Sequence, residues 1–212
     1  EYDDIQRLDR ILDSEGDSPN NYKASKQADV IMLFYLFSAE ELQLILEMLG
    51  YEWDPELIPR NIRYYLQRTS HGSTLSRLVH SWVLSRSNRE KSWEYFEEAL
   101  MSDFRDIQGG TTEEGIHLGA MAGTVDLIQR CYTGVDIRND ILWLNPCLPE
   151  ELKRLKLWIR YRGHWISLEI THDQMNVSFR EGWSSEVKIG VKGEIHTFEQ
   201  GDSAKFELTE GC

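Results

Sequence analysis

The periodicity of the apolar residues changes near residue 135 and divides the sequence into two parts. Before this point apolar residues recur at helical spacing, between clear helix start signals. After it, short segments rich in Val, Ile, Thr and aromatic residues alternate between apolar and polar positions, as half-buried strands do. The sequence therefore predicts a mainly α domain, residues 1–134, followed by an all-β domain, residues 135–212.

Local start signals allow the helices to be placed. Ser38 and Glu41 form a capping box, as do Ser87 and Glu90, and Asp54 precedes a proline at a first helical position. We expect helices at about 4–13, 25–37, 39–49, 55–68, 73–86, 89–105 and 113–132. We expect strands near 141–144, 154–161, 164–171, 174–180, 186–192, 194–199 and 203–208.

Composition excludes several classes of protein. The 212 residues are 41% hydrophobic and 11% aromatic, which is enough for one or two domains with real cores. With 36 acidic and 23 basic residues the net charge is −13, so the chain lacks the positive charge that draws proteins to nucleic acids or anionic lipid. The longest apolar run, Val30–Phe37, is too short to span a membrane. We expect a soluble protein with no nucleic-acid partner.

The three cysteines, Cys131, Cys147 and Cys212, have neither paired nor metal-like spacing. They are interpreted as reduced thiols of a cytoplasmic protein without a metal site. The sequence begins at Glu1, and its first helical pattern starts almost at once. This start predicts that the chain is a piece of a longer protein.

Two kinds of helix alternate along the first part. Segments Lys26–Phe37, Ser73–Leu84 and Gly115–Ile128 are apolar nearly all round, whereas those beginning near Ser38 and Pro55 have one charged face, as does the one near Ser87. The first kind must be buried inside and the second must lie outside. Inner and outer helices that alternate along a chain are typical of an (α/α) barrel.

Each predicted inner helix has its polar residues at its amino-terminal end. If the inner helices run parallel, these ends meet at one mouth of the barrel, where unpaired backbone N–H groups and helix dipoles favour a bound anion. The residues concerned are Ser25, Lys26, Gln27, Asp29, His71, Gly72, Ser73, Thr74, Ser76, Thr111, Thr112, Glu113, Glu114 and His117.

Each candidate also has a simpler explanation. Lys26 could meet a phosphate and Gln27 a sugar hydroxyl, or both could be solvated residues at a helix start. Ser73 and Ser76 beside Gly72 could form an anion pocket, or could be ordinary caps. His117, expected one turn inside its helix, could be a ligand or a core residue.

Three glycines of the last predicted helix, Gly115, Gly119 and Gly123, recur every four residues on one helical face. Each costs about 1 kcal/mol of helix propensity relative to alanine. We therefore expect this face to pack closely against a neighbouring helix.

At these same residues the sequence resembles the disaccharide phosphorylases of glycoside hydrolase family 65, which include trehalose, kojibiose and maltose phosphorylases. The resemblance covers the whole chain, and its third stretch is the longest and most specific. The stretches are Lys26–Val30, Thr69–Ser76, Gly110–Gly123, Gln129–Gly134 and Leu142–Pro146.

The resemblance implies the C-terminal half of an (α/α)6 barrel followed by an antiparallel β-sandwich. It implies an inverting phosphorolysis in which phosphate attacks an α-glucoside and releases β-glucose 1-phosphate, so that phosphate is a co-substrate and no cofactor is needed. Lys26 and Gln27 then bind the substrate. Phosphate is held by Gly72, Ser73, Ser76, Thr111 and His117. The form of His71–Ser73 favours trehalose or kojibiose over maltose.

The family's general acid, a glutamic acid, lies about a hundred residues before the Lys-Gln pair, so the resemblance places it outside this chain. Asp3, Asp4, Asp9 and Asp17 do not match its motif. We therefore expect no catalytic acid here and no activity of the chain alone. The partners implied are a disaccharide, phosphate, the missing N-terminal portion of the same protein and, in a homodimer, a second copy.

Two alternatives stay open. A hydrolase of the same family, similar to a trehalase, would place a carboxylate base where phosphate binds, and Glu113 and Glu114 keep this alternative open. A non-catalytic carbohydrate-binding or assembly module would use aromatic residues of the β domain, which could equally be core or scattered surface residues. These are Trp158, Tyr161, His164, Trp165 and Trp183.

Overall fold

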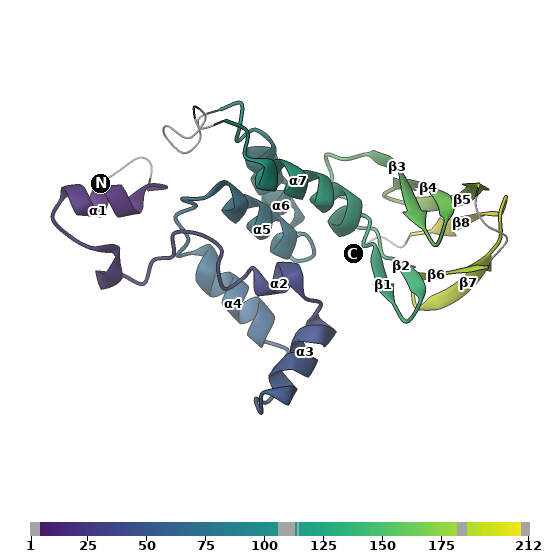
Figure 1. Cartoon of the computed structure of the whole chain (residues 1–212), viewed down its shortest axis with the longest axis horizontal. Coiled ribbons are helices and arrows are strands. Elements are labelled where there is room, and N and C mark those ends of the chain that lie inside the picture. Colours follow the sequence, from purple (N-terminus) through teal and green to yellow (C-terminus); the bar gives the residue numbers. More distant parts are fainter. Residues whose placement is uncertain (1–4, 106–112, 114, 182–185, 209–212) are drawn as a thin grey trace. The chain divides into compact units, whose positions relative to one another are not determined.

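A computed structural model of the protein describes residues 5–105, 113, 115–181 and 186–208. The chain divides into two compact units, Glu1–Thr124 and Val125–Cys212. Regular structure in the described part of the first unit is helical, and the second unit contains two β-sheets (Figure 1). None of the helices in the described ranges has the length and apolarity that crossing a membrane requires.

The helices follow the predicted order with shorter bounds. The chain passes from the first unit to the second within α7, and a π-helix, η3, directly continues α7. The elements are α1 (Leu8–Ser14), the 3₁₀ helix η1 (Pro19–Asn21), α2 (Leu33–Leu36), α3 (Ala39–Met48), α4 (Leu57–Leu66), α5 (Thr74–Leu84), α6 (Arg89–Leu100), α7 (Leu118–Asp126) and η3 (Leu127–Tyr132).

Helix caps explain where two of these helices begin. The Ser38 hydroxyl accepts a hydrogen bond from the backbone of Glu41, whose carboxylate accepts one from the backbone of Ser38, so the capping box predicted for α3 is confirmed. At α6 the prediction is wrong by one residue. Asn88, not Ser87, is the N-cap, and its side-chain oxygen accepts from the Lys91 N–H at 3.0 Å.

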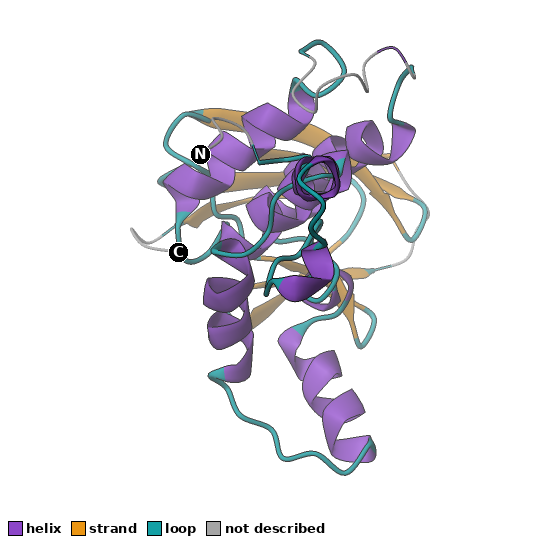
Figure 2. Cartoon of the chain, turned by 90° about the vertical axis from the view of Figure 1, so that its left-hand side faces the viewer, coloured by secondary structure: helices purple, strands orange, loops and turns teal. Residues whose placement is uncertain are grey.

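Helix α5 forms the centre of the first unit. Eight of its residues are buried, and it packs along α6. Small side chains let these two helices approach closely: the Ser81 hydroxyl donates to the Ser92 carbonyl at 2.8 Å, and the Ser92 hydroxyl donates to the Ser81 carbonyl at 2.6 Å. Both polar groups are thereby satisfied inside an apolar core. Figure 2 shows the helical unit from its side.

The predicted helix 25–37 is wrong over its first half. Ser25 forms a parallel β-bridge with Thr69, and Lys26 lies beside Gly72, with Ser25 N–H donating to the Arg68 carbonyl and Gly72 N–H to the Lys26 carbonyl, each at 2.8 Å. Helix α2 covers only four residues, and Leu33 and Leu36 are exposed. Backbone pairing between distant segments thus overrides the helical periodicity of residues 25–32.

The last predicted helix also begins later than expected. Helix α7 starts at Leu118, and His117 precedes it, with the His117 carbonyl accepting from the backbone of Ala120 and Met121. His117 is therefore at the helix start, not one turn inside. Thr111, Thr112 and Glu114, which precede His117 in the sequence, lie outside the described residues.

The second unit contains two four-stranded sheets, in the orders β1-β2-β6-β7 and β3-β4-β5-β8. Most pairs are antiparallel, but β2 pairs with β6 in parallel, which corrects the expected all-antiparallel arrangement. Strand β1 was not predicted. The strands are β1 (Asp136–Arg138), β2 (Ile141–Leu144), β3 (Arg154–Tyr161), β4 (His164–Thr171), β5 (Gln174–Glu181), β6 (Val187–Val191), β7 (Glu194–Phe198) and β8 (Ser203–Glu207).

Tight turns and an apolar interior hold the sheets together. The β3–β4 turn at Arg162-Gly163 has positive φ at both central residues, 49° and 85°, which matches the right-handed twist of the flanking strands. Alternate residues of β4 and β5 point inward and are fully buried. Phe179 of β5 stacks on Phe198 of β7, with ring centroids 5.0 Å apart, so the two sheets share one core.

The structure thus shows helices followed by largely antiparallel sheets. The closed ring of inner and outer helices stays a prediction from the family resemblance.

Candidate functional site

The predicted site residues come from three segments that run in the same direction. Segment 26–35 follows α5 in register, because Lys26 lies beside Gly72 and Tyr35 contacts Trp82 with ring centroids 4.8 Å apart. Between these two points, Ala28 and Ile31 pack against Val79. Contacts that advance together along both chains mean that the two segments are parallel.

Helix α7 is parallel to α5 by the same argument. A Cβ atom added to Gly119 would lie 3.6 Å from Leu75, and one added to Gly123 would lie 2.3 Å from Leu78. Close packing at Gly123 agrees with the prediction, whereas a Cβ atom on Gly119 would make only an ordinary contact. Gly115 precedes the helix and has a φ of +100°. The amino-terminal ends of α5 and α7 therefore face the same end of the helical unit, as does Lys26.

Lys26 and Gly72 are held together at this end. A Cβ atom on Gly72 would lie 2.8 Å from the Gln6 carbonyl oxygen and 3.0 Å from Lys26 Cγ, so the close approach requires glycine. Lys26 Nζ lies 3.4 Å from Asp9 Oδ2, and the lysine side chain is about half exposed. Burial opposes the charge on Asp9, but hydrogen bonds from Arg7, the Arg10 N–H and Lys26 outweigh it, so the pKa of Asp9 lies below its usual value.

Gln27 has a different environment from its neighbour. Its side chain is exposed, and its Nε2 donates to Asp29 Oδ1 at 2.8 Å. Gln27 therefore lies on the surface of the protein.

Ser73 is the N-cap of α5 by backbone geometry, with φ −143° and ψ 140°, yet its side chain makes no capping hydrogen bond. The first N–H groups of this 11-residue helix therefore donate no hydrogen bond to the Ser73 hydroxyl. Ser76 is different: it is 1% exposed, and its Oγ lies 3.0 Å from His71 Nδ1. The two serines thus differ in exposure and partner.

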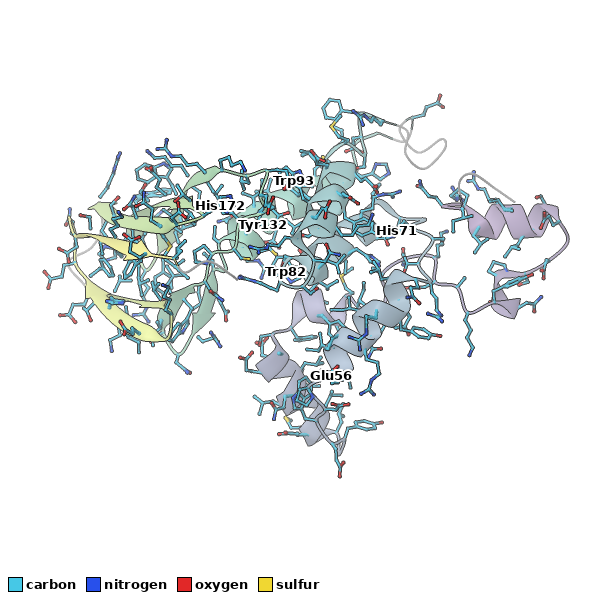
Figure 3. The ribbon with its side chains drawn as sticks, turned by 180° about the vertical axis from the view of Figure 1, so that it is seen from behind. Glu56, His71, Trp82, Trp93, Tyr132 and His172 are labelled. Carbon is cyan, nitrogen blue, oxygen red and sulfur yellow. The ribbon has the colours of Figure 1, made fainter. Side chains whose placement is uncertain are left out.

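His71 was not assigned a role from the sequence. It has a φ of +57°, which is uncommon for a residue with a side chain, and it lies at the turn into α5 (Figure 3). Burial, followed by the nearby charges of His80 and Arg77, lowers the pKa of His71 to about 3. The imidazole is therefore neutral at physiological pH, and its ring packs against those of His80 and Tyr95.

A buried arginine holds this turn from behind. Arg77 is 4% exposed, and its Nε donates to Glu98 Oε2 of α6 at 2.6 Å. Its Nη1 lies 3.4 Å from the His71 carbonyl oxygen and donates to it. Arg77 is a charged residue in the largely apolar sequence of α5, and this is the signal from which the contact could have been predicted. The contact connects α6 to the turn at His71.

His117 forms a pair with Asp103, the residue that sequence reasoning missed. His117 Nδ1 lies 2.7 Å from Asp103 Oδ1, and the His117 backbone N–H donates to Asp103 Oδ2 at 3.1 Å. Both side chains are largely covered. A carboxylate at Nδ1 fixes the ring and directs Nε2 away from it, where Nε2 can accept a hydrogen bond or, when protonated, donate one.

The structure thus brings together Lys26 with Gly72, and places Ser73, Ser76 and His117 on parallel helices. Thr111 lies outside the described residues. His117 is held by Asp103 and Ser76 by His71, so each of these predicted ligands has a protein partner in this structure.

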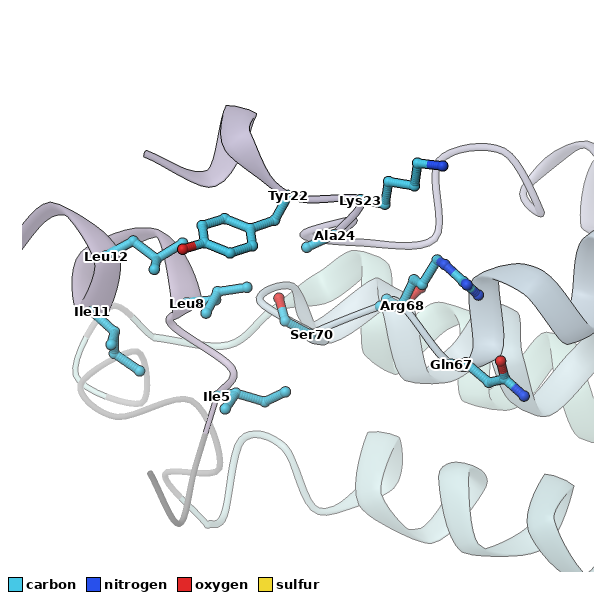
Figure 4. A pocket seen from close by; sticks show the side chains of 11 residues that line it. Ile5, Leu8, Ile11, Leu12, Tyr22, Lys23, Ala24, Gln67, Arg68 and Ser70 are labelled. Carbon is cyan, nitrogen blue, oxygen red and sulfur yellow. The ribbon is translucent and has the colours of Figure 1, made fainter. Parts of the chain in front are cut away.

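A groove of about 490 Å³ lies next to residues 67–70, the segment that leads into His71 (Figure 4). Apolar residues of the α1 segment line one side of the groove, and residues 67–70 line the other. Its lining consists of Ile5, Leu8, Ile11, Leu12, Tyr22, Lys23, Ala24, Gln67, Arg68, Thr69 and Ser70. The predicted binding residues are not among those that line it.

Comparison with known families identifies the class of protein. Residues 1–126 match the model of the glycosyl hydrolase family 65 central catalytic domain, and residues 135–198 match that of the family 65 C-terminal domain. The chain therefore belongs to glycoside hydrolase family 65, as its sequence motifs predicted.

Individual relatives fall in the same family. The chain is 50% identical over 208 residues to an uncharacterized glycosyl hydrolase of Mycobacterium tuberculosis, a match that covers 95% of this chain and 16% of that protein. It is 34% identical over 208 residues to the trehalose 6-phosphate phosphorylase of Lactococcus lactis, covering 98% of this chain and 26% of that enzyme. A kojibiose phosphorylase of Halothermothrix orenii is 28% identical over 174 residues, covering 79% of this chain and 20% of that enzyme.

A solved structure supports the fold. A candidate kojibiose phosphorylase from the human microbiome superimposes with a TM-score of 0.68 at 24% identity, over 86% of this chain and 23% of that one. The chain thus spans about a sixth to a quarter of the length of the proteins that it matches.

Proposed function

We propose that this chain is the phosphate-holding part of an inverting disaccharide phosphorylase. The observation that carries the proposal is the parallel course of three segments, which brings Lys26, the start of α5 and the start of α7 to one end of the helical unit. Two adjacent helix starts offer an anion backbone N–H donors, and Lys26 adds a positive charge at the same end. Phosphorylases among the relatives support an anionic co-substrate.

In this mechanism the site residues divide into those that hold phosphate and those that hold the sugar. The Gly72 and Ser73 region and His117 hold inorganic phosphate, with the Ser73 hydroxyl as a donor because it does not cap its own helix. Lys26 and Gln27 hold the sugar. Ser76 supports this arrangement through its contact with His71, and Thr111 is proposed as a further phosphate ligand.

The reaction proceeds by displacement at the anomeric carbon. A phosphate oxygen attacks that carbon from the face opposite the glycosidic oxygen, the glycosidic C–O bond breaks, and a glutamic acid of the remaining portion of the protein gives its proton to the leaving oxygen. The products are β-glucose 1-phosphate and the free acceptor sugar. We propose a trehalose- or kojibiose-type glucoside as substrate, and no cofactor.

The test is phosphate dependence in the full-length protein that contains this chain. Trehalose and kojibiose are supplied with and without inorganic phosphate, and the anomeric form of the glucose 1-phosphate is followed by proton NMR. We expect cleavage only with phosphate, and a β product. Cleavage that proceeds equally well without phosphate would instead support a hydrolase of this family.

A second function is favoured by one observation on the β3-β4-β5-β8 sheet. Of the five aromatic candidates, Tyr161 and His164 are buried, and Trp183 lies outside the described residues. Trp158 and Trp165 are exposed on neighbouring strands, and register places Trp158 opposite Ser167 of β4, two residues from Trp165. Exposed indole rings at this spacing can stack on sugars.

Binding of a glucose oligosaccharide to the chain, measured by calorimetry, tests this second function. Loss of binding in Trp158→Ala and Trp165→Ala, but not in Tyr64→Ala on α4, would support a carbohydrate-binding role. Tyr64 is a suitable control because its exposure, 40%, equals that of Trp158. Unchanged binding in all three variants, or no binding at all, would contradict it.

A further inference from the structure

Helix α3 exposes a large apolar surface, which is uncommon in a soluble domain that has no partner. Leu44, Ile45, Met48, Leu49 and Tyr51, which we call the α3 face, are all exposed, with Met48 at 87% and Leu49 at 66%. Positions 44, 45, 48 and 49 lie in two adjacent rows on one side of a helix. The face is therefore continuous and not a scatter of single residues.

The rest of the helix shows that this face is separate from the core contact. Leu42 is buried and Leu46 is half-buried, and at a spacing of four residues they form one covered row of the helix. Gln43 and Glu47 form a polar row in which the Gln43 amide donates to the Glu47 carboxylate at 2.8 Å. Helix α3 is thus apolar on a second side, a pattern typical of a helix with neighbours on two sides.

Charge around the α3 face limits what can cover it. Residues 27–59 contain seven carboxylates and no Lys, Arg or His. Arg60 pairs with Asp54 and Arg63 pairs with Glu56, while Glu47 and Glu52 give the α3 face an acidic rim. Residues 1–134 carry 23 of the 36 acidic and 13 of the 23 basic residues. Two copies docked through this face would bring like charges together.

The exposed apolar side chains are also unevenly distributed. Along the described chain, most large exposed hydrophobics belong to the first unit, whereas the β-sheets expose only Ile137, Trp158, Trp165 and Ile195. The first unit is the part that matches the family's central catalytic domain, and the relatives are about four to six times longer than this chain. The uncovered surface thus lies in the catalytic portion.

We propose that the α3 face is the surface on which the remaining portion of the family 65 protein packs, through an apolar patch with a basic rim. This inference rests on the proposed function only because both concern the same larger protein. The new element is the location of the contact, which lies on α3.

Thiol accessibility tests this location. Met48→Cys and Ile195→Cys are made separately in the chain and in a chimera, in which the chain replaces the matched segment of the Lactococcus lactis trehalose 6-phosphate phosphorylase. We expect the Met48→Cys thiol to react with a maleimide at least tenfold more slowly in the chimera than in the chain alone. The Ile195→Cys thiol, on β7 and 53% exposed, serves as the control and should react equally in both.

A charge variant provides a second measurement. Met48→Glu should leave the unfolding midpoint of the isolated chain unchanged, because the side chain is exposed there, but should lower the midpoint of the chimera. Ile195→Glu should change neither midpoint. Equal reactivity of the Met48→Cys thiol in chain and chimera would overturn the proposal. Concentration-dependent protection in the chain alone would also overturn it, in favour of a second copy.

Activity of the chimera is a separate outcome. Protection at Met48 without phosphorolysis would leave the α3 contact standing while the proposed function fails.

Discussion

Gly123 of α7 lies directly against Leu78 of α5, so closely that a Cβ atom on the glycine would be 2.3 Å from the leucine Cδ2. This contact fixes how near α7 comes to α5. It therefore also governs how near His117, at the start of α7, comes to Ser73, at the start of α5.

We expect Gly123→Ala to destabilise the helical unit by about 1–3 kcal/mol, because overpacking outweighs the helix propensity gained. Gly119→Ala is the matched control. Its Cβ would meet Leu75 at an ordinary 3.6 Å, so the substitution should be neutral or stabilising by up to about 1 kcal/mol. Urea unfolding measures both. Equal effects of the two substitutions would contradict the close α5–α7 contact.

Acidification should destabilise the protein through His71. Its folded-state pKa of about 3 lies below the unfolded value of 6.5, so below pH 6.5 the unfolded state binds the proton first. The free energy of unfolding should fall as pH drops from about 6.5 toward 3, and should not depend on His71 above that range. His80, whose pKa is also lowered by burial, adds to the effect.

His71→Asn removes this titration and suits the positive φ, so the unfolding free energy should depend less on pH in the variant. The exposed His172→Asn is the control and should keep the wild-type slope. Chemical unfolding at a series of pH values measures all three proteins. A His71→Asn slope identical to that of wild type would be incompatible with a buried neutral imidazole.

The arginine that supports the His71 turn should not tolerate lysine. Arg77→Lys loses the planar geometry that reaches Glu98 and the His71 carbonyl together, and we expect a cost of about 1–3 kcal/mol. Arg63→Lys, in an exposed pair with Glu56, should change stability by less than about 0.5 kcal/mol. Thermal unfolding distinguishes them. Similar small changes in both variants would show that Arg77 does not hold the turn.

Two serines at helix starts should behave differently. Ser38→Ala removes a capping box and should cost about 1 kcal/mol. Ser73→Ala should change the free energy of unfolding by less than about 0.5 kcal/mol, because its hydroxyl makes no cap hydrogen bond. Unfolding of both variants in urea checks this pair. A loss at Ser73 as large as that at Ser38 would mean that Ser73 is a structural cap.

The sequence was most informative where the structure depends on local signals. Strands β3 and β4 have the bounds that alternation predicted, because one face of each strand is buried. The capping box at Ser38 was likewise legible, since both of its partners lie within four residues. Strand β1, which was missed, has only exposed residues and therefore no alternation to detect.

Features that depend on distant contacts could not be predicted. The non-helical backbone at Ser25 and Lys26 is held by hydrogen bonds to residues more than 40 positions away, which no local pattern records. The parallel pairing of β2 with β6 likewise joins strands that are far apart in the sequence. Asp103 was missed because it contacts His117 across 14 positions of the sequence, and neither residue shows this contact in the sequence.

The affinity of the full-length protein for phosphate tests the central claim most directly, because the account places phosphate between the starts of α5 and α7. In steady-state phosphorolysis we expect Ser73→Ala and His117→Asn each to raise the KM for phosphate at least tenfold, with the KM for the disaccharide nearly unchanged. Ser38→Ala, the structural control, should leave both constants unchanged. An unaltered KM for phosphate in both site variants would contradict the account.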